Sequence, residues 1–260
     1  VKYPFASSMA GEHGKFGFFQ SEAEMYRRIA TELGMICSNE NRSQLSYCRY
    51  PLVYLMEAAD DICYEIMDIE DSHKLKILTF AETDLLLGFF DEDGRNHILQ
   101  RLKDEEVTDR NEQVVYMRAC VVGLLEHECV KTFVEHEEQI LNGEFKGSLI
   151  SNMSEPLRQA YQRCVKTSYA KIYQSKPVLD VELSGYKIME TLMQTLVNAA
   201  VHPEKFHSQQ LIKRFSSQYD IHSDDLETRL MAVVDYISGM TDVYALDVYQ
   251  KINGIALPIV

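Results

Sequence analysis

The strongest constraint on the fold is the spacing of apolar residues in the stretch that follows Pro51. Between residues 52 and 69 they recur at the i, i+3, i+4 and i+7 positions that place side chains on one face of an α-helix. The residues of this apolar face are Leu52, Leu55, Met56, Ala59, Ile62, Cys63, Ile66 and Ile69. Because proline is tolerated in the first turn of a helix, Pro51 marks its start. The stretch predicts an amphipathic helix that packs one face into a core.

The same periodicity recurs along most of the chain. It predicts further helices over residues 22–33, 73–90, 95–104, 110–142, 155–165, 183–200, 204–218 and 223–253. Residues 166–182 differ because they gather β-forming residues around Pro177, namely Tyr169, Ile172, Tyr173, Val178 and Val181. The sequence therefore predicts a mostly α-helical, multi-helical globule, with room for a short extended excursion near 166–182.

Composition narrows the class of protein. A length of 260 residues allows one large domain, or a main domain with a smaller appendage. The net charge of −14 disfavours nonspecific binding to the nucleic-acid backbone, while single-stranded nucleic acid stays open as an effector. The six cysteines form no CxxC pair, which disfavours a disulfide framework or a structural zinc site. No run of about 18 apolar residues and no signal-peptide pattern occurs, so we expect a cytoplasmic protein that does not enter membranes.

The opposite face of the 52–69 helix is acidic. It carries Glu57, Asp60, Asp61, Tyr64, Glu65 and Asp68. Asp60, Tyr64 and Asp68 are four residues apart, so they stack one turn above another and can address one ligand together. A solvated helix face is the more common explanation of such a pattern. Since no Lys or Arg within 52–69 offsets the repulsion between these carboxylates, an external cation is the alternative.

Five stretches of the chain resemble one enzyme family. They are RYPLVYLMEAADDICYEIMDIED at 49–71, VKYP at 1–4, KFGFFQSE at 15–22, YMRACVVGLLEHECVKTFVEHEEQILNGEF at 116–145 and VVDYISGMTDVYALDVYQKI at 233–252. All five are similar to segments of the deoxyguanosine triphosphate triphosphohydrolases of the HD superfamily. The resemblance implies an HD-domain-like helical fold, with 1–143 as the C-terminal part of the hydrolase core and 144–260 as a C-terminal helical region. It also implies a homo-oligomer that converts dGTP and water to deoxyguanosine and tripolyphosphate.

The resemblance assigns roles by position in the motifs. It implies that Asp60 binds a divalent metal ion, with Mg, Mn, Fe and Ni as candidates, and a hard cation suits a carboxylate oxygen. Tyr64 would lie against the deoxyribose, and Asp68 would form a hydrogen bond with the sugar hydroxyl. The other implied substrate contacts are Lys2 and Lys15 at the triphosphate, with Arg118 and Arg229 at the nucleotide.

The adjacent His-Asp pair that gives the HD superfamily its name does not occur anywhere in this sequence. Tyr50 also stands where many relatives have His. We expect the chain to be the C-terminal part of such an enzyme, inactive on its own, so no catalytic residue is assigned; a degenerate relative is the other explanation. Two further alternatives stay open. One is a nucleotide-responsive assembly or regulatory module of an HD-family oligomer, and the other is an unrelated helical protein whose acidic face is only solvated.

Overall fold

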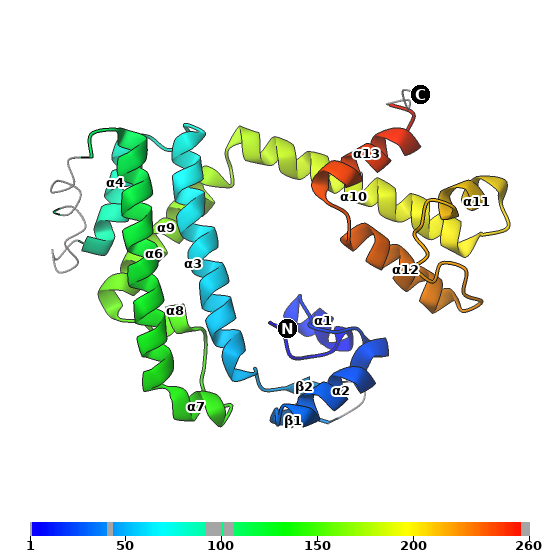
Figure 1. Ribbon diagram of the computed structural model, residues 1–260, viewed down its shortest axis with the longest axis horizontal. Coiled ribbons are helices and arrows are strands. Elements are labelled where there is room, and N and C mark those ends of the chain that lie inside the picture. Colours follow the sequence, from blue (N-terminus) through cyan, green and yellow to red (C-terminus); the bar gives the residue numbers. More distant parts are fainter. Residues whose placement is uncertain (1, 41–43, 92–99, 101–106, 256–260) are drawn as a thin grey trace. The chain divides into compact units, whose positions relative to one another are not determined.

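The computed structural model describes residues 2–40, 44–91, 100 and 107–255, and most of these residues are α-helical (Figure 1). The chain divides into two compact units, Val1–Gln174 and Ser175–Val260, each with a hydrophobic core of its own. The prediction of a mostly α-helical globule is confirmed. The predicted division at residues 143 and 144 concerns the core of the enzyme family and stays a prediction.

Most elements of the first unit are helices. They are α1 (Ala10–His13), α2 (Ala23–Glu32), α3 (Pro51–Lys74), α4 (Phe80–Gly88), α6 (Arg110–Glu135), α7 (Glu137–Leu141), α8 (Leu149–Asn152) and α9 (Glu155–Thr167). Two short antiparallel strands, β1 (Cys37–Asn39) and β2 (Ser46–Tyr47), form a hairpin between α2 and α3.

Helix α3 starts where the sequence predicts and runs further than expected. Tyr50 has an extended backbone and Pro51 occupies the first turn, where its missing N–H leaves no hydrogen bond unmade. The helix lies alongside α6 over much of its length (Figure 1). The core between them includes Ile62, Ile66 and Ile69 from α3 and Met117, Val121 and Leu125 from α6. Helix α3 is therefore held rigidly along one side.

A small cluster holds the N-terminal segment in place. Its buried members are Ala6, Phe18, Ala30, Leu45 and Tyr47. The N–H of Tyr47 donates to the carbonyl of Pro4 at 2.8 Å, and the N–H of Ala6 donates to the carbonyl of Leu45 at 3.1 Å. These bonds tie the first residues to the hairpin that leads into α3.

The described part of the second unit, residues 175–255, consists of four helices around a separate core. They are α10 (Lys176–Val201), α11 (Phe206–Ile212), α12 (Leu226–Ser238) and α13 (Asp242–Ile252). The C-terminal half of α10 packs against the other three through Leu192, Leu196 and Ala199, which meet Val233 and Val248. The predicted helix over 223–253 is interrupted after Ser238, because Thr241 caps a new helix by accepting the N–H of Tyr244.

The extended excursion predicted near 166–182 is wrong. Residues Ser168–Ile172 form a π-helical turn that continues α9, and α10 begins at Lys176 with Pro177 in its first turn. Proline is compatible with that position, so the residue taken as a strand interruption is a helix start. Tertiary packing also overrides the weak β preference of residues such as Ile172, which is buried in the core of the first unit.

Other helix predictions differ in their bounds: α10 begins at Lys176 and not at residue 183, and α11 ends at Ile212 and not at residue 218. The helix predicted over 73–90 is split, because α3 ends at Lys74 and Thr79 caps α4 in a reciprocal pair of hydrogen bonds with Glu82. The helix predicted over 95–104 lies almost wholly outside the described residues. Over the part of the chain that the structure describes, every helix is too short or too polar to cross a lipid bilayer.

Candidate functional site

Helix α3 buries a different face from the one predicted. Ile62, Ile66 and Ile69 are buried as expected, but Leu52 and Met56 are 59% and 51% exposed. The buried face also contains Val53, Tyr54, Ala58 and the acids Glu57, Glu65 and Glu70. The helix carries two apolar stripes, and contacts with α6, α8 and α9 select one of them. That choice places three carboxylates of α3 against the protein, where each needs a partner.

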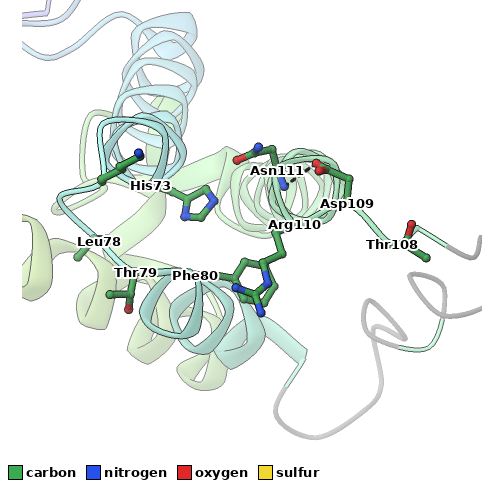
Figure 2. Close-up of a pocket in the computed structure, with 9 residues that line it drawn as sticks. His73, Leu78, Thr79, Phe80, Thr108, Asp109, Arg110 and Asn111 are labelled. Carbon is green, nitrogen blue, oxygen red and sulfur yellow. Dashed lines mark hydrogen bonds between the residues drawn. The ribbon is translucent and has the colours of Figure 1, made fainter.

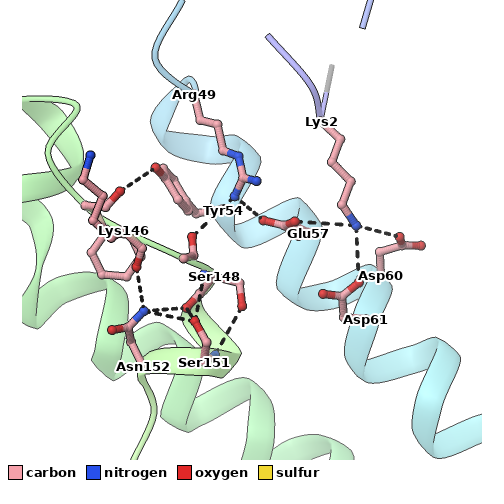
Figure 3. A network of polar contacts seen from close by, with 12 residues as sticks. Lys2, Arg49, Tyr54, Glu57, Asp60, Asp61, Lys146, Ser148, Ser151 and Asn152 are labelled. Atoms are coloured by element: carbon pink, nitrogen blue, oxygen red, sulfur yellow. Dashed lines mark hydrogen bonds and ion pairs between the residues drawn. The ribbon is translucent and has the colours of Figure 1, made fainter. Parts of the chain in front are cut away.

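Lys2 brings a positive charge to the middle of α3 (Figure 3). Its ammonium lies 3.3 Å from a carboxylate oxygen of Asp61, 3.6 Å from Glu57 and 3.9 Å from Asp60. Arg49, just before the helix, forms a 2.8 Å ion pair with the buried Glu57. Burial by itself would lower the pKa of Lys2, but the charges of Asp61 and Glu57 outweigh it and raise that pKa. The lysine is therefore a permanent cation beside Asp60.

Asp60, Tyr64 and Asp68 follow one another along α3 as the sequence predicts. The side chain of Asp60 is 70% exposed and Tyr64 is 66% exposed, so both are open to a ligand. Asp68 is half-buried and accepts a 2.7 Å hydrogen bond from the hydroxyl of Tyr173. Burial raises the pKa of Asp68, although the bond from Tyr173 opposes this. The row thus has two open side chains and one that the protein orients.

The π-helical turn Ser168–Ile172 supplies partners to α3. The hydroxyl of Ser168 donates to the buried carboxylate of Glu65 at 2.7 Å, and Tyr173 follows the turn directly. Desolvation raises the pKa of Glu65, because a hydroxyl compensates a buried carboxylate less than a cation does. π-Helical turns are frequent at functional sites. Here the turn contacts the same helix that carries the row of three residues.

Two predicted cations of the first unit have other contacts. Lys15 is exposed, and its ammonium lies over the ring of Tyr3, 5.6 Å from the centroid. Arg118 pairs with the buried Glu70 through a 2.7 Å contact, and Lys74 pairs with the same carboxylate at 2.5 Å. Arg118 therefore contacts the C-terminal part of α3, beyond the row.

Arg229 belongs to the second unit. It donates to the carbonyl of Ala200 at 2.9 Å, and a second nitrogen donates to the carbonyls of Ser223 at 2.8 Å and Asp224 at 3.1 Å. These bonds connect the end of α10 to the loop before α12. The structure brings Lys2, Asp60, Tyr64 and Asp68 together on α3, and it places Arg229 in a different compact unit.

Sequence reasoning missed the partners of the acidic face. Arg49 lies eight residues before Glu57, just ahead of the helix, and was the nearest cation in the sequence that could have suggested the pair. Ser168 and Tyr173 lie 103 and 105 residues from their partners, and no local pattern indicates such contacts. Only the packing of the π-helical turn on α3 identifies them.

The donors on α3 fit a divalent metal in part. Asp60 offers exposed carboxylate oxygens, the hard ligand that Mg²⁺ and Mn²⁺ prefer. Among the described residues, no three His, Cys, Asp or Glu side chains gather closely enough to hold a metal ion. Asp60 therefore fits as one ligand, and a complete ligand set would need further groups.

Comparison with known proteins gives a consistent family. Residues 151–251 match the model of a phosphohydrolase-associated domain. The chain is 30% identical over 268 residues to a deoxyguanosinetriphosphate triphosphohydrolase-like protein of Pseudomonas aeruginosa, and 30% identical over 251 residues to one of Synechocystis sp.. A deoxyguanosinetriphosphate triphosphohydrolase of Cronobacter sakazakii is 25% identical over 284 residues.

The alignments cover nearly all of this chain but little more than half of each relative. They include 99%, 94% and 93% of the chain, and 59%, 53% and 54% of the three relatives in the same order. The similarity thus runs through both compact units. Together with the helical fold and the matched domain, it confirms the predicted resemblance to the deoxyguanosinetriphosphate triphosphohydrolases of the HD superfamily.

Proposed function

We propose that this chain forms one wall of the active site of a deoxynucleoside triphosphate triphosphohydrolase. The proposed reaction converts dGTP and water to deoxyguanosine and tripolyphosphate. The observation that carries the proposal is the row Asp60, Tyr64 and Asp68 on α3, with Lys2 beside its first member and Tyr173 bonded to its last. It is supported by relatives that carry the name of this activity.

The row suits the three parts of a deoxynucleotide. The ammonium of Lys2 is a mobile point charge that would hold phosphate oxygens, and the exposed Lys15 would assist it. The exposed ring of Tyr64 would pack against the deoxyribose and leave no room for a 2′-hydroxyl. Asp68 would accept a hydrogen bond from the sugar hydroxyl, and Tyr173 would keep that carboxylate oriented.

Asp60 would contribute one carboxylate to a divalent metal ion, for which Mg, Mn, Fe and Ni are candidates. When bound, such an ion polarises a phosphoryl oxygen and lowers the pKa of bound water. This chain's own part is to present Asp60 next to Lys2, so that the cation site and the phosphate site adjoin on one helix. We assign no acid–base residue, and we expect the 260 residues alone to bind nucleotide without hydrolysing it.

Hydrolysis of dGTP by the intact natural protein tests the proposal. Asp60→Asn should lower kcat/KM by at least about 100-fold, which corresponds to about 2.7 kcal/mol of barrier. Asp71→Asn is the matched control, because Asp71 is also an exposed acid of α3 and lies outside the row. Wild-type hydrolysis and metal content in the Asp60→Asn protein would contradict the proposal.

Selectivity for the sugar gives a second measurement. Tyr64→Ala should admit GTP and reduce the preference for dGTP by about tenfold, the size of effect expected when a steric block to one group is removed. Arg118 and Arg229 stay predictions as nucleotide contacts. Their Lys variants would raise KM for dGTP if those contacts exist, and would leave KM unchanged if the arginines only stabilise the fold.

An assembly module is the second candidate function, and the surface of α10 favours it. Between Lys176 and Thr191 no side chain is buried. The exposed apolar residues of this half are Leu179, Val181, Leu183, Tyr186 and Met189, which are 39–74% exposed. An apolar surface of this kind is typical of a protein interface. Mass measurement in solution with and without dGTP tests whether the protein forms homo-oligomers and whether they respond to nucleotide.

A further inference from the structure

A recess lies at the far end of α3 from Lys2, where α4 and α6 begin (Figure 2). Its volume is about 570 Å³. The lining residues are His73, Lys76, Leu78, Thr79, Phe80, Thr108, Asp109, Arg110 and Asn111. His73 is thirteen residues after Asp60, which is about 20 Å along a helix axis. Asp68, the last residue of the row, is five residues before His73, so the recess lies beyond the C-terminal end of the row and away from Asp60 and Lys2.

Of the described residues that line the recess, the two cations are available to a ligand, whereas the one acid, Asp109, already accepts hydrogen bonds from the backbone. Among the described residues, neither Lys76 nor Arg110 forms an ion pair with a carboxylate. The guanidinium of Arg110 rests over the ring of Phe80, 5.2 Å from the centroid, which leaves its N–H groups available. By contrast, Asp109 accepts the N–H groups of Asn111 and the next residue at 2.9 and 3.0 Å. The lining thus offers positive charge in a chain whose net charge is −14.

A buried ring nitrogen adds an unpaired polar group. The Nδ1 atom of His73 is buried and has no hydrogen-bond partner within the described part of the chain. The ring lies edge-on to Phe80 at 6.0 Å, between the end of α3 and the two helix starts (Figure 2). Buried polar atoms of folded proteins nearly always have a partner, so an unpaired nitrogen in a residue that lines the same recess as Lys76 and Arg110 points to a ligand.

The backbone conformation of Lys76 is a further indication of a ligand site. Its φ of +58° is positive, and no other residue except glycines has a positive φ in the described part of the chain. The conformation ends α3, since the N–H groups of Ile77 and Leu78 both donate to the carbonyl of Ser72. Glycine adopts this conformation without steric cost, whereas lysine does not. Lys76 thus occupies a position whose backbone conformation favours glycine. Strained residues of this kind cluster at functional sites, which is consistent with a role for its ammonium at the recess.

We propose that this recess binds the phosphate groups of a small anionic ligand. Arg110 would hold phosphate oxygens with two parallel N–H donors and Lys76 would add a point charge. His73 and the amide of Asn111 would supply further hydrogen bonds. The helix N–H groups next to Asp109 are already used, so the ligand would be held by side chains. The volume suits an oligophosphate or a nucleotide better than a single phosphate ion.

Calorimetric titration of the full chain without divalent metal tests the proposal. The probes are inorganic phosphate, inorganic tripolyphosphate and dGTP. We expect tripolyphosphate to bind at one site, about tenfold more weakly after Arg110→Ala and about fivefold more weakly after Lys76→Gly. Because glycine relieves the backbone at position 76, the Lys76→Gly protein should keep or raise its Tm. Lost binding in that protein cannot then be attributed to unfolding.

Two control variants locate the binding. Lys146→Ala removes the same charge near the opposite end of α3, where the adjacent Phe145 carbonyl accepts a bond from Tyr54. Lys2→Ala removes the cation of the proposed active-site wall. Lys146→Ala should change the affinity for tripolyphosphate less than about twofold, and Lys2→Ala should weaken only the binding that the two recess variants leave intact.

The outcomes separate the ligands and the sites. Tighter binding of dGTP than of tripolyphosphate, with the same loss in both recess variants, identifies a nucleotide; equal binding identifies the phosphate chain alone. Absence of binding by all three probes would overturn the proposal, as would affinities that Arg110→Ala and Lys76→Gly leave unchanged. A loss confined to Lys2→Ala would also overturn it, because the phosphate would then bind at the middle of α3.

Discussion

The two compact units differ in whether they bury charged side chains. In the first unit Glu57, Glu65, Glu70 and Asp91 are buried, whereas in the described part of the second unit Ser208 is the one buried residue that is not apolar. Burying a carboxylate costs free energy unless a partner compensates it. The second unit is therefore held by ordinary apolar packing. The first holds α3 with its acids turned partly inward, an arrangement that packing alone does not favour and that contacts with Arg49, Arg118 and Ser168 compensate.

The buried acids of α3 also differ from one another. Burial would raise the pKa of Glu70, but hydrogen bonds and charges from Lys74 and Arg118 outweigh it and lower that pKa. Among the described residues, Glu65 has only the hydroxyl of Ser168 as a hydrogen-bond partner, and burial raises its pKa. A cation partner thus keeps a buried carboxylate ionised, while a hydroxyl partner does so less well. Substitutions in the first unit should therefore change stability in a way that depends on pH, whereas substitutions in the apolar core of the second unit should not.

The largest effect is expected in the apolar core of the second unit. Leu196→Ala removes a fully buried side chain of α10 and should lower the free energy of unfolding by about 2–5 kcal/mol. Hydrogen exchange followed by mass spectrometry should show faster exchange in α10–α13, with little dependence on pH between about 5 and 8. An equal increase in the exchange rate of α3 would contradict the distinction between the two units, because the two cores would then unfold together.

A smaller loss is expected from removing a cation of the first unit. Arg118→Met leaves Glu70 with Lys74 alone and should cost about 2 kcal/mol in urea unfolding at pH 7. The double variant Arg118→Met/Glu70→Met should recover all but about 1 kcal/mol, because no buried charge is then left uncompensated.

The pH dependence of the Arg118→Met effect follows from the lowered pKa of Glu70. A lowered carboxylate pKa contributes stability above the unfolded value of about 4.5, and that stability is lost as the pH falls through the folded value. The difference between wild type and Arg118→Met should therefore shrink below pH 4.5. A difference that grows on acidification would show that Arg118 acts through packing rather than charge.

Tyr173→Phe tests the link between the π-helical turn and the row on α3. Loss of the hydroxyl removes the 2.7 Å bond to Asp68 and should cost about 1–1.5 kcal/mol. Because that bond lowers the pKa of Asp68, its removal should raise this pKa further, measurable by NMR titration of the carboxyl carbon. An unchanged pKa of Asp68 would show that the π-helical turn does not influence the row on α3.

The smallest effect, and one of opposite sign, is expected at Glu65. An acid whose folded pKa is raised binds more protons in the folded state, so its stability contribution falls as the pH rises from about 4.5 to the folded value. Glu65→Gln removes this penalty and keeps an acceptor for Ser168. Thermal unfolding should show a gain of order 1 kcal/mol at pH 7 and no gain at pH 4. Ser168→Ala, which leaves the carboxylate without its donor, should change stability in the other direction.

The sequence predicted the fold class and the row better than it predicted burial. Apolar spacing located α3 and most other helices because a helix needs only local hydrogen bonds and one apolar face. It failed at 166–182, where Pro177 was compatible with either a strand edge or a helix start. The predicted apolar face of α3 was also partly wrong, because Leu52 and Val53 are equally apolar and only packing determines which of them is buried.

The sequence by itself determined that the chain is helical, that Asp60, Tyr64 and Asp68 line up on one helix, and that its motifs resemble one enzyme family. These properties depend on spacing and residue type within short segments. Only the tertiary structure decided which acids of α3 are buried, that Lys2 reaches Asp60, and that Tyr173 holds Asp68. It also placed Lys76 and Arg110 at one recess. These contacts join residues far apart in the chain, and the free energy that selects them comes from packing the whole unit.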